Sequence, residues 1–452
     1  MKQISEQEQY QVMTETPIAR LVPRLAVPTM VSMVITGVYN MADTYFVSKL
    51  GTSASGAVGV VFSLMAIIQA IGFTLGLGSG SIISRLLGRQ RREEAEEIAN
   101  TGLFVAILCG VLLAVFGSLS VRPMMLLLGA TDTMLPYAVD YGRYILYASP
   151  VMCVSFVLSN LLRAEGKAKF SMIGIAFGGV LNIVLDPLFI FTFGFQTAGA
   201  AMATALSQLI SCGILLLAYL RGSTILRLRP AAISRRGAVY LMILKDGLPS
   251  LTRQGLASIS TVALNRGARL YGDAAVAAMG IVGKVFMLIF SVLIGFCQGY
   301  QPVAGYNYGA KKFGRLRGAF RFTLLMGMAI MSVLAAVGFV FAPQIVGLVL
   351  KSDPQVVSIG ARAFRMQCAA LPLLPLMITC NMTFQSTGRA LWATLTSSLR
   401  QGIVFLPIIL ILPAAFGLTG IEAAQAVSDL ISVLLCIPFM VAFFRRLRET
   451  ER

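Results

Sequence analysis

The sequence predicts an all-α polytopic membrane protein, with twelve transmembrane helices in two pseudo-symmetric lobes of six helices each. Three observations lead to this fold class. The composition is 57% hydrophobic and only 12% charged, with a mean hydropathy of +0.81. The chain contains many runs of the about 20 apolar residues that a membrane-spanning helix needs. It also matches itself at a shift of 221 residues.

The predicted spans are twelve apolar runs. They cover residues 24–49, 54–84, 98–121, 133–162, 168–193, 196–220, 243–271, 274–306, 318–342, 355–386, 389–414 and 418–444. The linkers after even-numbered spans are rich in Lys and Arg, as in Arg89 to Arg92, Arg221 to Arg236 and Lys311 to Arg317. Because basic loops of membrane proteins gather on the cytoplasmic side, we expect both termini to be cytoplasmic.

An internal repeat divides these spans into two copies. Six spans lie in each copy, so both have the same orientation in the membrane. The shift of 221 residues aligns Pro28 with Pro249, Ala57 with Ala278, Gly59 with Gly280, Gly78 with Gly299, and Gly88 with Gly309. We expect an N-terminal lobe at residues 1–220, a cytoplasmic linker at 221–242 and a C-terminal lobe at 243–452. Parallel repeats of this kind recur in transporters, with the binding site near the membrane midplane.

The net charge and the reactive side chains limit the partners and the ion-binding groups that this chain can have. The basic linkers account for the net charge of +18, so we expect no nucleic-acid partner. The seven cysteines lie in or beside apolar runs without a CxxC pair, which predicts free thiols and no metal site. Histidine is absent. A proton carrier near neutral pH therefore has to be a carboxylate whose surroundings disfavour its charge.

The most informative polar group is Asp186, in the fifth predicted span. A charged Asp at the centre of a bilayer costs about 2.5–3.5 kcal/mol, so it has to be neutralised, hydrated or paired. Asn182 lies four residues earlier on the same helix face, and Pro187 removes the backbone donor for the carbonyl of Ile183. We interpret this as a proton or cation site coupled to a helix bend. The structural alternative is a buried Asp satisfied by the amide beside a kink.

Other polar candidates in the N-terminal lobe are Asp43 near the outer end of the first span, Tyr39 one turn before it, Thr204 in the sixth span, and Gln208 one turn later. The repeat partner of Asp43 is the apolar Leu264, and Asp186 also aligns with an apolar stretch. We therefore expect ion coupling in the N-terminal lobe. The alternative for Asp43 is a solvated residue at a helix end.

The C-terminal lobe has cations inside its predicted spans instead of acids: Arg253, Lys284 and Arg400. Asp429, midway along the last span, is an available partner for them. The functional interpretation is a polar cavity wall that handles anionic or zwitterionic groups. The alternative is one or two structural ion pairs.

Taken together, these residues resemble the multidrug and toxic compound extrusion (MATE) family, in a MepA-like branch of its DinF-type group. The resemblance covers essentially the whole chain and rests on Tyr39 with Asp43, Asn182 with Asp186 and Pro187, Thr204, Leu162 to Gly166, and Gln301 to Ala310. It implies the MATE fold and a secondary antiporter that exports mostly cationic, amphipathic compounds in exchange for H⁺ or Na⁺. It also implies a proton- or cation-binding network of Tyr39, Asp43, Asn182, Asp186 and Thr204.

The expected function is therefore multidrug efflux by alternating access across the bacterial inner membrane. We expect small-molecule drugs or organic cations as cargo, lipid as the surroundings, a monomer, no cofactor besides the coupling ion, and no enzyme activity. The candidate cavity residues are Arg253, Lys284, Arg400 and Gln208. One alternative is a flippase of the same superfamily that holds the pyrophosphate of a lipid-linked precursor with these cations. Another is an intramembrane hydrolase with Asp43 and Asp186 as a catalytic dyad, which the proline and the duplicated architecture disfavour.

Overall fold

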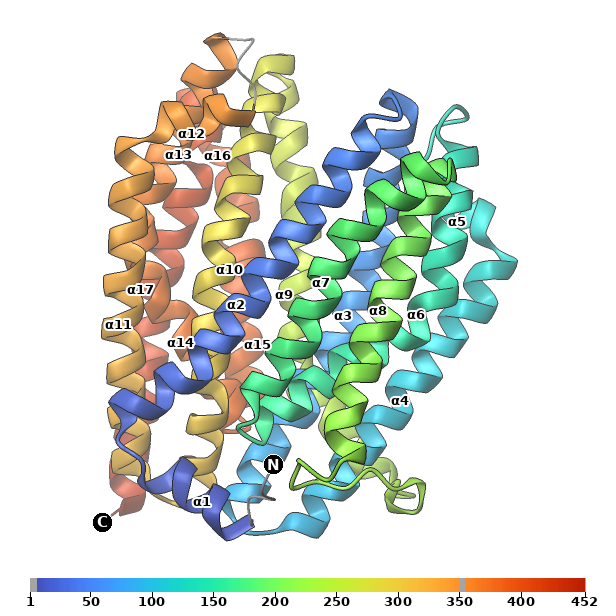
Figure 1. Cartoon of the computed structure of the whole chain (residues 1–452). Helices are drawn as coiled ribbons and strands as arrows, with labels where there is room; N and C mark the ends of the chain where they lie inside the picture. Colours follow the sequence, from blue (N-terminus) through green and yellow to red (C-terminus); the bar gives the residue numbers. More distant parts are fainter. Residues whose placement is uncertain (1–5, 350–353, 452) are drawn as a thin grey trace.

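The computed structural model describes residues 6–349 and 354–451, which form one bundle of long helices (Figure 1). The described residues contain no strand, so the all-α fold class is confirmed. The first half of the chain forms α1 (Glu6–Glu15), α2 (Ile18–Ser48), α3 (Thr52–Gly88), α4 (Arg92–Leu119), α5 (Val121–Leu127), α6 (Leu135–Ala164), α7 (Ala168–Pro187), η1 (Leu188–Thr192) and α8 (Gln196–Leu220).

The linker contains the short η2 (Pro230–Ala232), and the second half of the chain follows it. Its helices are α9 (Gly237–Arg269), α10 (Asp273–Gly309), α11 (Phe313–Val340), α12 (Ala342–Val349), α13 (Pro354–Ala370), η3 (Leu371–Leu373), α14 (Leu374–Ser386), α15 (Ala390–Ser398), η4 (Leu399–Ile403), α16 (Phe405–Phe416) and α17 (Leu418–Glu451). The division into lobes at 220 and 243 stays a prediction.

Eleven helical segments among the described residues are long and apolar enough to cross a membrane. The predicted seventh span corresponds to α9, which falls outside this set. It is 33 residues long and carries Lys245, Asp246, Arg253 and Arg266 along its length. These charges make α9 more polar than its neighbours, although it packs against α3 and α15 within the bundle. Eleven of the twelve predicted spans are thus long and apolar enough to cross a membrane, and the polytopic fold is confirmed.

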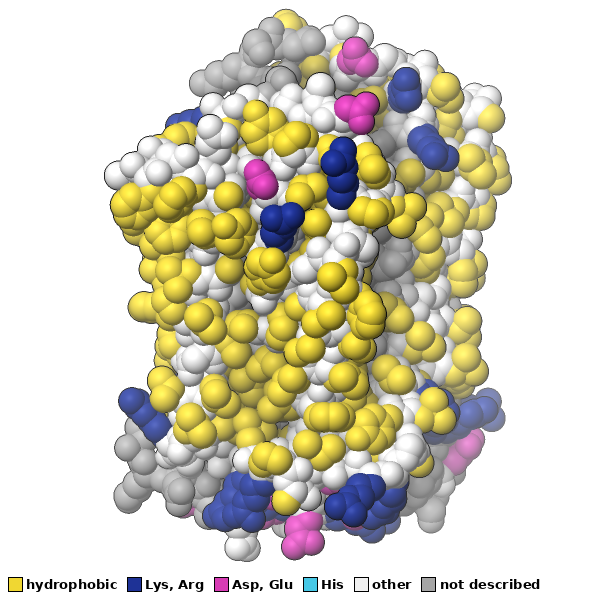
Figure 2. All heavy atoms as spheres, turned by 90° about the vertical axis from the view of Figure 1, so that its right-hand side faces the viewer, with side chains coloured by type: hydrophobic (Ala, Val, Ile, Leu, Met, Phe, Trp, Pro, Cys, Tyr) yellow, Lys and Arg dark blue, Asp and Glu magenta, His cyan; other side chains and the backbone are white. Residues whose placement is uncertain are grey.

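The surface is suited to a lipid environment. Both termini lie at the same end of the bundle, which we call the termini end (Figure 1). Figure 2 shows Lys and Arg side chains at that end and toward the opposite end, with a broad apolar belt between them. Helix α4, for example, exposes Leu108, Val115 and Phe116. Exposed apolar area of this extent marks a surface that contacts lipid or another apolar partner.

The two halves of the chain pack most closely near the termini end. A Cβ atom at Gly78 of α3 would collide with the backbone of Ile243 and Gly247 in α9. A Cβ atom at Gly309 of α10 would collide in the same way with the carbonyl group of Arg85 in α3. Glycine at these positions allows the helix backbones to approach each other directly. The bundle is therefore tightly closed at this end.

Candidate functional site

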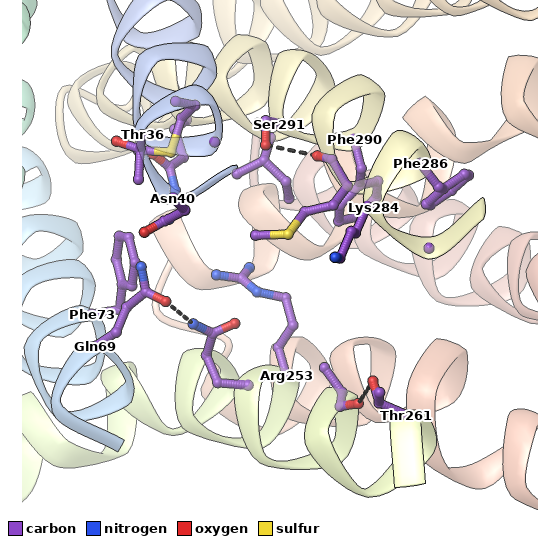
Figure 3. A pocket seen from close by; sticks show the side chains of 18 of the residues that line it. Thr36, Asn40, Gln69, Phe73, Arg253, Thr261, Lys284, Phe286, Phe290 and Ser291 are labelled. Atoms are coloured by element: carbon purple, nitrogen blue, oxygen red, sulfur yellow. Dashed lines mark hydrogen bonds between the residues drawn. The ribbon is translucent and has the colours of Figure 1, made fainter. Parts of the chain in front are cut away.

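A cavity of about 670 Å³ lies between the two halves of the chain. Its size is within the range of about 300–1,000 Å³ that is usual for small-molecule sites. Residues of α2, α3, α6, α7 and α8 form one wall, and residues of α9, α10, α14 and α15 contribute to the other (Figure 3). Much of the wall is aromatic. Phe73 and Phe156 lie with ring centroids 5.2 Å apart, and Phe286 and Phe290 are stacked at 5.8 Å.

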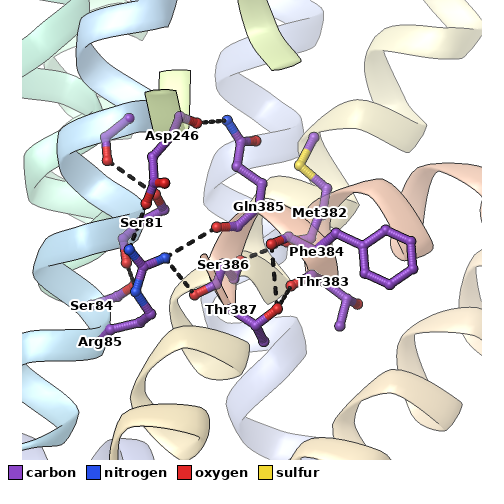
Figure 4. Close-up of polar contacts among 11 residues, drawn as sticks. Ser81, Ser84, Arg85, Asp246, Met382, Thr383, Phe384, Gln385, Ser386 and Thr387 are labelled. Atoms are coloured by element: carbon purple, nitrogen blue, oxygen red, sulfur yellow. Dashed lines mark hydrogen bonds and ion pairs between the residues drawn. The ribbon is translucent and has the colours of Figure 1, made fainter. Parts of the chain in front are cut away.

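A polar network separates this cavity from the termini end (Figure 4). Phe73 lines the cavity, and Arg85 lies about 18 Å further along α3, at 1.5 Å per residue. Arg85 forms an ion pair with Asp246 on α9. It also donates hydrogen bonds to the carbonyl oxygens of Gln385 and Ser386, at 3.3 and 3.2 Å. One side chain of the first half thus joins two helices of the second half below the cavity.

Four of the five predicted coupling residues meet in one buried cluster. Asn182 donates from Nδ2 to Asp186 Oδ1 and to Thr204 Oγ1, each at 3.2 Å. The Tyr141 hydroxyl donates to Asp43 Oδ2 at 3.1 Å. Tyr141 also lies beside Asp186 and Thr204, so it connects the two acids into a single cluster. The predicted shared face of Asn182 and Asp186 is confirmed.

The two carboxylates are buried without complete hydrogen bonding. Asp43 is only 3% exposed, so the alternative of a solvated residue is wrong. Asp43 Oδ1 and Asp186 Oδ2 have no partner among the described residues. A buried carboxylate in this state is costly unless it takes up a proton or a cation. Of the described residues, Asn182 and Thr204 line the cavity whereas the two acids do not, so the acids lie one layer behind its wall.

The remaining predicted residues, Tyr39 and Gln208, lie on the cavity wall. Tyr39 lies beside Asp43 and Gln208, but the hydroxyl that donates to Asp43 belongs to Tyr141. Tyr141 was not predicted as a site residue. Its signal in the sequence is a series of tyrosines at helical spacing, Tyr137, Tyr141 and Tyr144, within an apolar span.

Helix α7 changes geometry directly after Asp186. The α-helix ends at Pro187 and continues as the π-helical turn η1. Proline cannot donate the backbone hydrogen bond that an α-helix requires at this point, so the predicted distortion is confirmed. Single π-helical turns are frequent at functional sites. The π-helical turn η1 therefore places an irregular segment of the helix close to Asp186.

Arg400 lies in a second π-helical turn, η4, and is paired. Its Nε lies 2.8 Å from Asp429 Oδ1, and its Nη2 lies 3.4 Å from Asp429 Oδ2. The guanidinium also lies 4.3 Å from the ring centroid of Phe290. The expected availability of Asp429 as a partner is confirmed for Arg400, whose charge is thereby neutralised.

Three other cations line the cavity without an acidic partner among the described residues: Arg253, Lys284 and Arg163. Figure 3 shows Arg253 and Lys284 directed into the cavity. Arg163 donates to Asn160 Oδ1 at 2.8 Å, and its Nη1 is buried without a partner. Arg163 directly follows the fourth predicted span, where a linker residue is expected. The structure places it at the end of α6 and on the cavity wall.

Comparisons with known proteins cover most of the chain. The MatE family model matches residues 28–188 and 249–411. The multidrug export protein MepA of Staphylococcus saprophyticus is 25% identical over 444 residues, which are 98% of this chain and 97% of that protein. An outward-facing multidrug resistance MATE family transporter of the MOP superfamily is similar in structure, with a TM-score of 0.93, 25% identity and 99% of each chain covered.

A second solved structure is a MOP superfamily transporter from Pyrococcus furiosus, with a TM-score of 0.92 and 26% identity. The match covers 98% of this chain and 99% of that one. That protein has a binding pocket of reverse polarity, which suggests a different function for it.

Proposed function

This chain belongs to the MatE family, and from that premise we propose that it is a secondary active antiporter that exports amphipathic drug-like compounds in exchange for H⁺ or Na⁺. The match to the family covers a stretch in each half of the chain, and the two stretches begin at residues 28 and 249. As a member of a transporter family the chain is not an enzyme, which removes the hydrolase alternative. Its similarity to MepA supports multidrug export as the physiological task.

The observation that carries the proposal is the pair of buried acids behind the cavity wall. Asp43 and Asp186 each have one oxygen without a protein partner. Either acid can take up H⁺ or contribute to a small cation site, with Asn182 and Thr204 between them and the cavity. Ion binding at this position changes the hydrogen bonds of residues that the cargo contacts. The coupling ion and the cargo can therefore disfavour each other, and such coupling is reciprocal.

The transport cycle follows from this coupling and from the closed termini end. We place the termini end in the cytoplasm of a bacterial cell, with the protein in the inner membrane. In the state described here Arg85 and Asp246 close the passage below the cavity. Ion binding from outside releases cargo in this state. Separation of Arg85 from Asp246 then opens the cavity to the cytoplasm, where the ion leaves and new cargo binds.

The protein acts as a monomer in this scheme, because one chain supplies both walls of the cavity. It needs no cofactor besides the coupling ion. The family resemblance favours mostly cationic cargo. The charge of the cargo is a separate question, however, because no acidic side chain among the described residues lines the cavity.

One observation favours a second candidate function, a flippase for lipid-linked precursors. Arg253 and Lys284 project into the cavity without acidic partners among the described residues, as a site for a pyrophosphate requires. In this candidate function the same two-walled cavity would hold the headgroup. Transport by the antiporter requires the buried acids Asp43 and Asp186, whereas transport by the flippase does not.

Transport by the purified protein in proteoliposomes tests the proposal. Movement of fluorescent dyes, cationic and anionic, is measured under a pH gradient and, separately, under a Na⁺ gradient. The wild type is compared with Asp186→Asn and with Asp140→Asn, whose acid is exposed on α6 beside Tyr141. We expect one gradient to drive dye movement in the wild type and in Asp140→Asn but not in Asp186→Asn.

The gradient that works identifies the coupling ion. Transport that persists in Asp186→Asn at the wild-type rate contradicts the proposed coupling site. A wild-type protein that moves no dye under either gradient, but flips a short-chain lipid phosphate, favours the flippase.

A further inference from the structure

The charge on the cavity wall is strongly one-sided. Arg163, Arg253, Lys284 and Arg400 line the cavity, and among the described residues no Asp or Glu does so. Of these four, Arg400 alone has an acidic partner within the described part of the chain, Asp429 at 2.8 Å. A cavity of this kind within a bilayer attracts anionic groups and repels cationic ones.

We infer that the cavity binds amphipathic organic anions. Arg253 and Lys284 hold a carboxylate, sulfonate or phosphate group, and the aromatic side chains hold an apolar body. The inference rests on the proposed export function and names the chemical class of the cargo for that same cavity.

The two cations are placed to share one anionic group. Arg253 extends from α9 and Lys284 from α10, and Figure 3 shows both side chains directed into the same space. No described residue forms an ion pair or a hydrogen bond with either of them. A guanidinium supplies two parallel donors that match a carboxylate or phosphate. An ammonium group on a flexible stem adds a mobile charge.

Aromatic surfaces for the apolar body lie on both walls. Phe286 and Phe290 are neighbours of Lys284 on α10 and stack at 5.8 Å (Figure 3). Phe73 and Phe156 form a second pair, at 5.2 Å, on the wall of the first half. An anionic headgroup attached to an aromatic or alicyclic body therefore meets complementary groups at both of its ends.

A purely structural role does not explain Arg253 and Lys284. Two cations elsewhere in the bundle have acidic partners: Arg85 binds Asp246, and Arg400 binds Asp429. The charge of Arg253, which is partly buried and has no counter-charge among the described residues, raises the free energy of the empty protein. An anionic cargo removes this cost, whereas a cationic cargo adds to it.

The test is equilibrium binding of two probes that share one apolar body, pyrenebutanoate and pyrenebutyltrimethylammonium. The full-length protein is studied in lipid nanodiscs, and empty nanodiscs correct for partition into lipid. We expect the anion to bind at least about tenfold more tightly than the cation. Arg253→Gln and Lys284→Gln should each weaken anion binding about tenfold, because a charge-assisted hydrogen bond is lost.

The control variants separate charge from fold. Lys284→Arg keeps the charge and should retain anion binding. Arg266→Gln removes an exposed cation of α9 that does not line the cavity, and it should change the affinity for neither probe. Tighter binding of the cationic probe overturns the inference. So does unchanged anion binding in both Arg253→Gln and Lys284→Gln.

A competition arm identifies the source of the anion. Farnesyl phosphate that displaces pyrenebutanoate at lower concentration than a soluble aromatic carboxylate indicates a lipid-linked phosphate. Displacement by the aromatic carboxylate at lower concentration indicates a soluble amphiphile. Either result supports an anion site. Binding is measured without an ion gradient, so it does not depend on coupling. Anion binding without gradient-driven transport contradicts only the proposed antiport, and gradient-driven export of cations without anion binding contradicts only this inference.

Discussion

The guanidinium of Arg85 on α3 binds the carboxylate of Asp246 on α9, and this ion pair joins the two halves of the chain at the termini end. The two side chains are only 12% and 7% exposed. Arg85 also donates to two carbonyl oxygens of α14, so three helices meet at one cation (Figure 4). A closure that depends on one ion pair and close glycine contacts can open by rigid-body motion of the halves, without unfolding of a helix.

Asp246→Asn should therefore favour opening at the termini end, because it removes the charge that Arg85 binds. The measurement is maleimide labelling of a cysteine placed at Ser250 in a background without native cysteines. Ser250 is fully buried one turn along α9 toward the cavity. In inside-out vesicles we expect labelling to be about tenfold faster, which corresponds to a shift of about 1.4 kcal/mol. Asp273→Asn, an exposed acid at the start of α10, is the control, and equal labelling rates in all three proteins would contradict the role of the pair.

Tyr141→Phe tests the coupling cluster without changing its size. The variant keeps the ring but loses the hydroxyl that donates to Asp43 Oδ2 at 3.1 Å. A hydrogen bond to a charged group contributes about 1.5–3 kcal/mol, so we expect gradient-driven transport to fall by about tenfold or more. Tyr137→Phe, one turn earlier on α6 and only partly buried, should transport like the wild type. If the two variants are equally active, Tyr141 has no part in coupling.

Local parts of this cluster could be predicted from the sequence. Asn182 and Asp186 share a face because residues four apart in a helix are neighbours, and the distortion at Pro187 follows from its missing donor. The contact between Tyr141 and Asp43 could not be predicted in this way. It joins residues 98 positions apart on α2 and α6, so it depends on the tertiary packing of the helices.

The sequence also could not show which cations of the cavity have an acidic partner. Arg253, Lys284 and Arg400 were visible in the sequence as cations inside apolar spans. Hydropathy could not show that Asp429 neutralises only one of them, because the pairing depends on the rotation of α17 about its axis. Arg163 was missed since its place at a span end is typical of a basic linker. Its burial depends on the contacts of α6 with neighbouring helices.

The pair of Arg400 and Asp429 makes a prediction about stability. Asp429→Asn leaves a buried guanidinium without its counter-charge, and breaking such a pair costs about 3–5 kcal/mol. We expect a lower Tm for the detergent-solubilised protein. The double variant Arg400→Leu, Asp429→Leu should recover most of the loss, because both charges are removed together.

An exposed pair serves as the control for this measurement. Arg91 and Glu94 lie 3.1 Å apart with side chains 58% and 52% exposed. Pairs of this kind contribute about 0–1 kcal/mol, so Glu94→Gln should leave Tm nearly unchanged. A loss in Asp429→Asn no larger than the loss in Glu94→Gln would show that the buried pair is not structural.

Glu165 connects the loop after α6 to the linker between the halves. Its side chain is fully buried. It accepts hydrogen bonds from the backbone N–H of Ile225 at 2.7 Å and from the Tyr219 hydroxyl at 3.1 Å. Burial raises the pKa of the Glu165 carboxyl to about 7, although these hydrogen bonds oppose part of the increase. The group lies between two membrane-spanning segments rather than within one.

This raised pKa predicts the direction of a pH effect. Between about pH 4.5 and pH 7 the Glu165 carboxyl is protonated in the folded protein but ionised in the unfolded chain. The resulting stabilisation is present below about pH 4.5 and is lost as the pH rises through about 7. Glu165→Gln keeps a neutral acceptor that cannot ionise. Its Tm should match the wild type near about pH 5 and exceed it at about pH 8, whereas Glu93→Gln, an exposed acid of α4, should follow the wild type at both. A difference in Tm between Glu165→Gln and the wild type that is the same at both pH values would mean that ionisation of Glu165 does not affect stability.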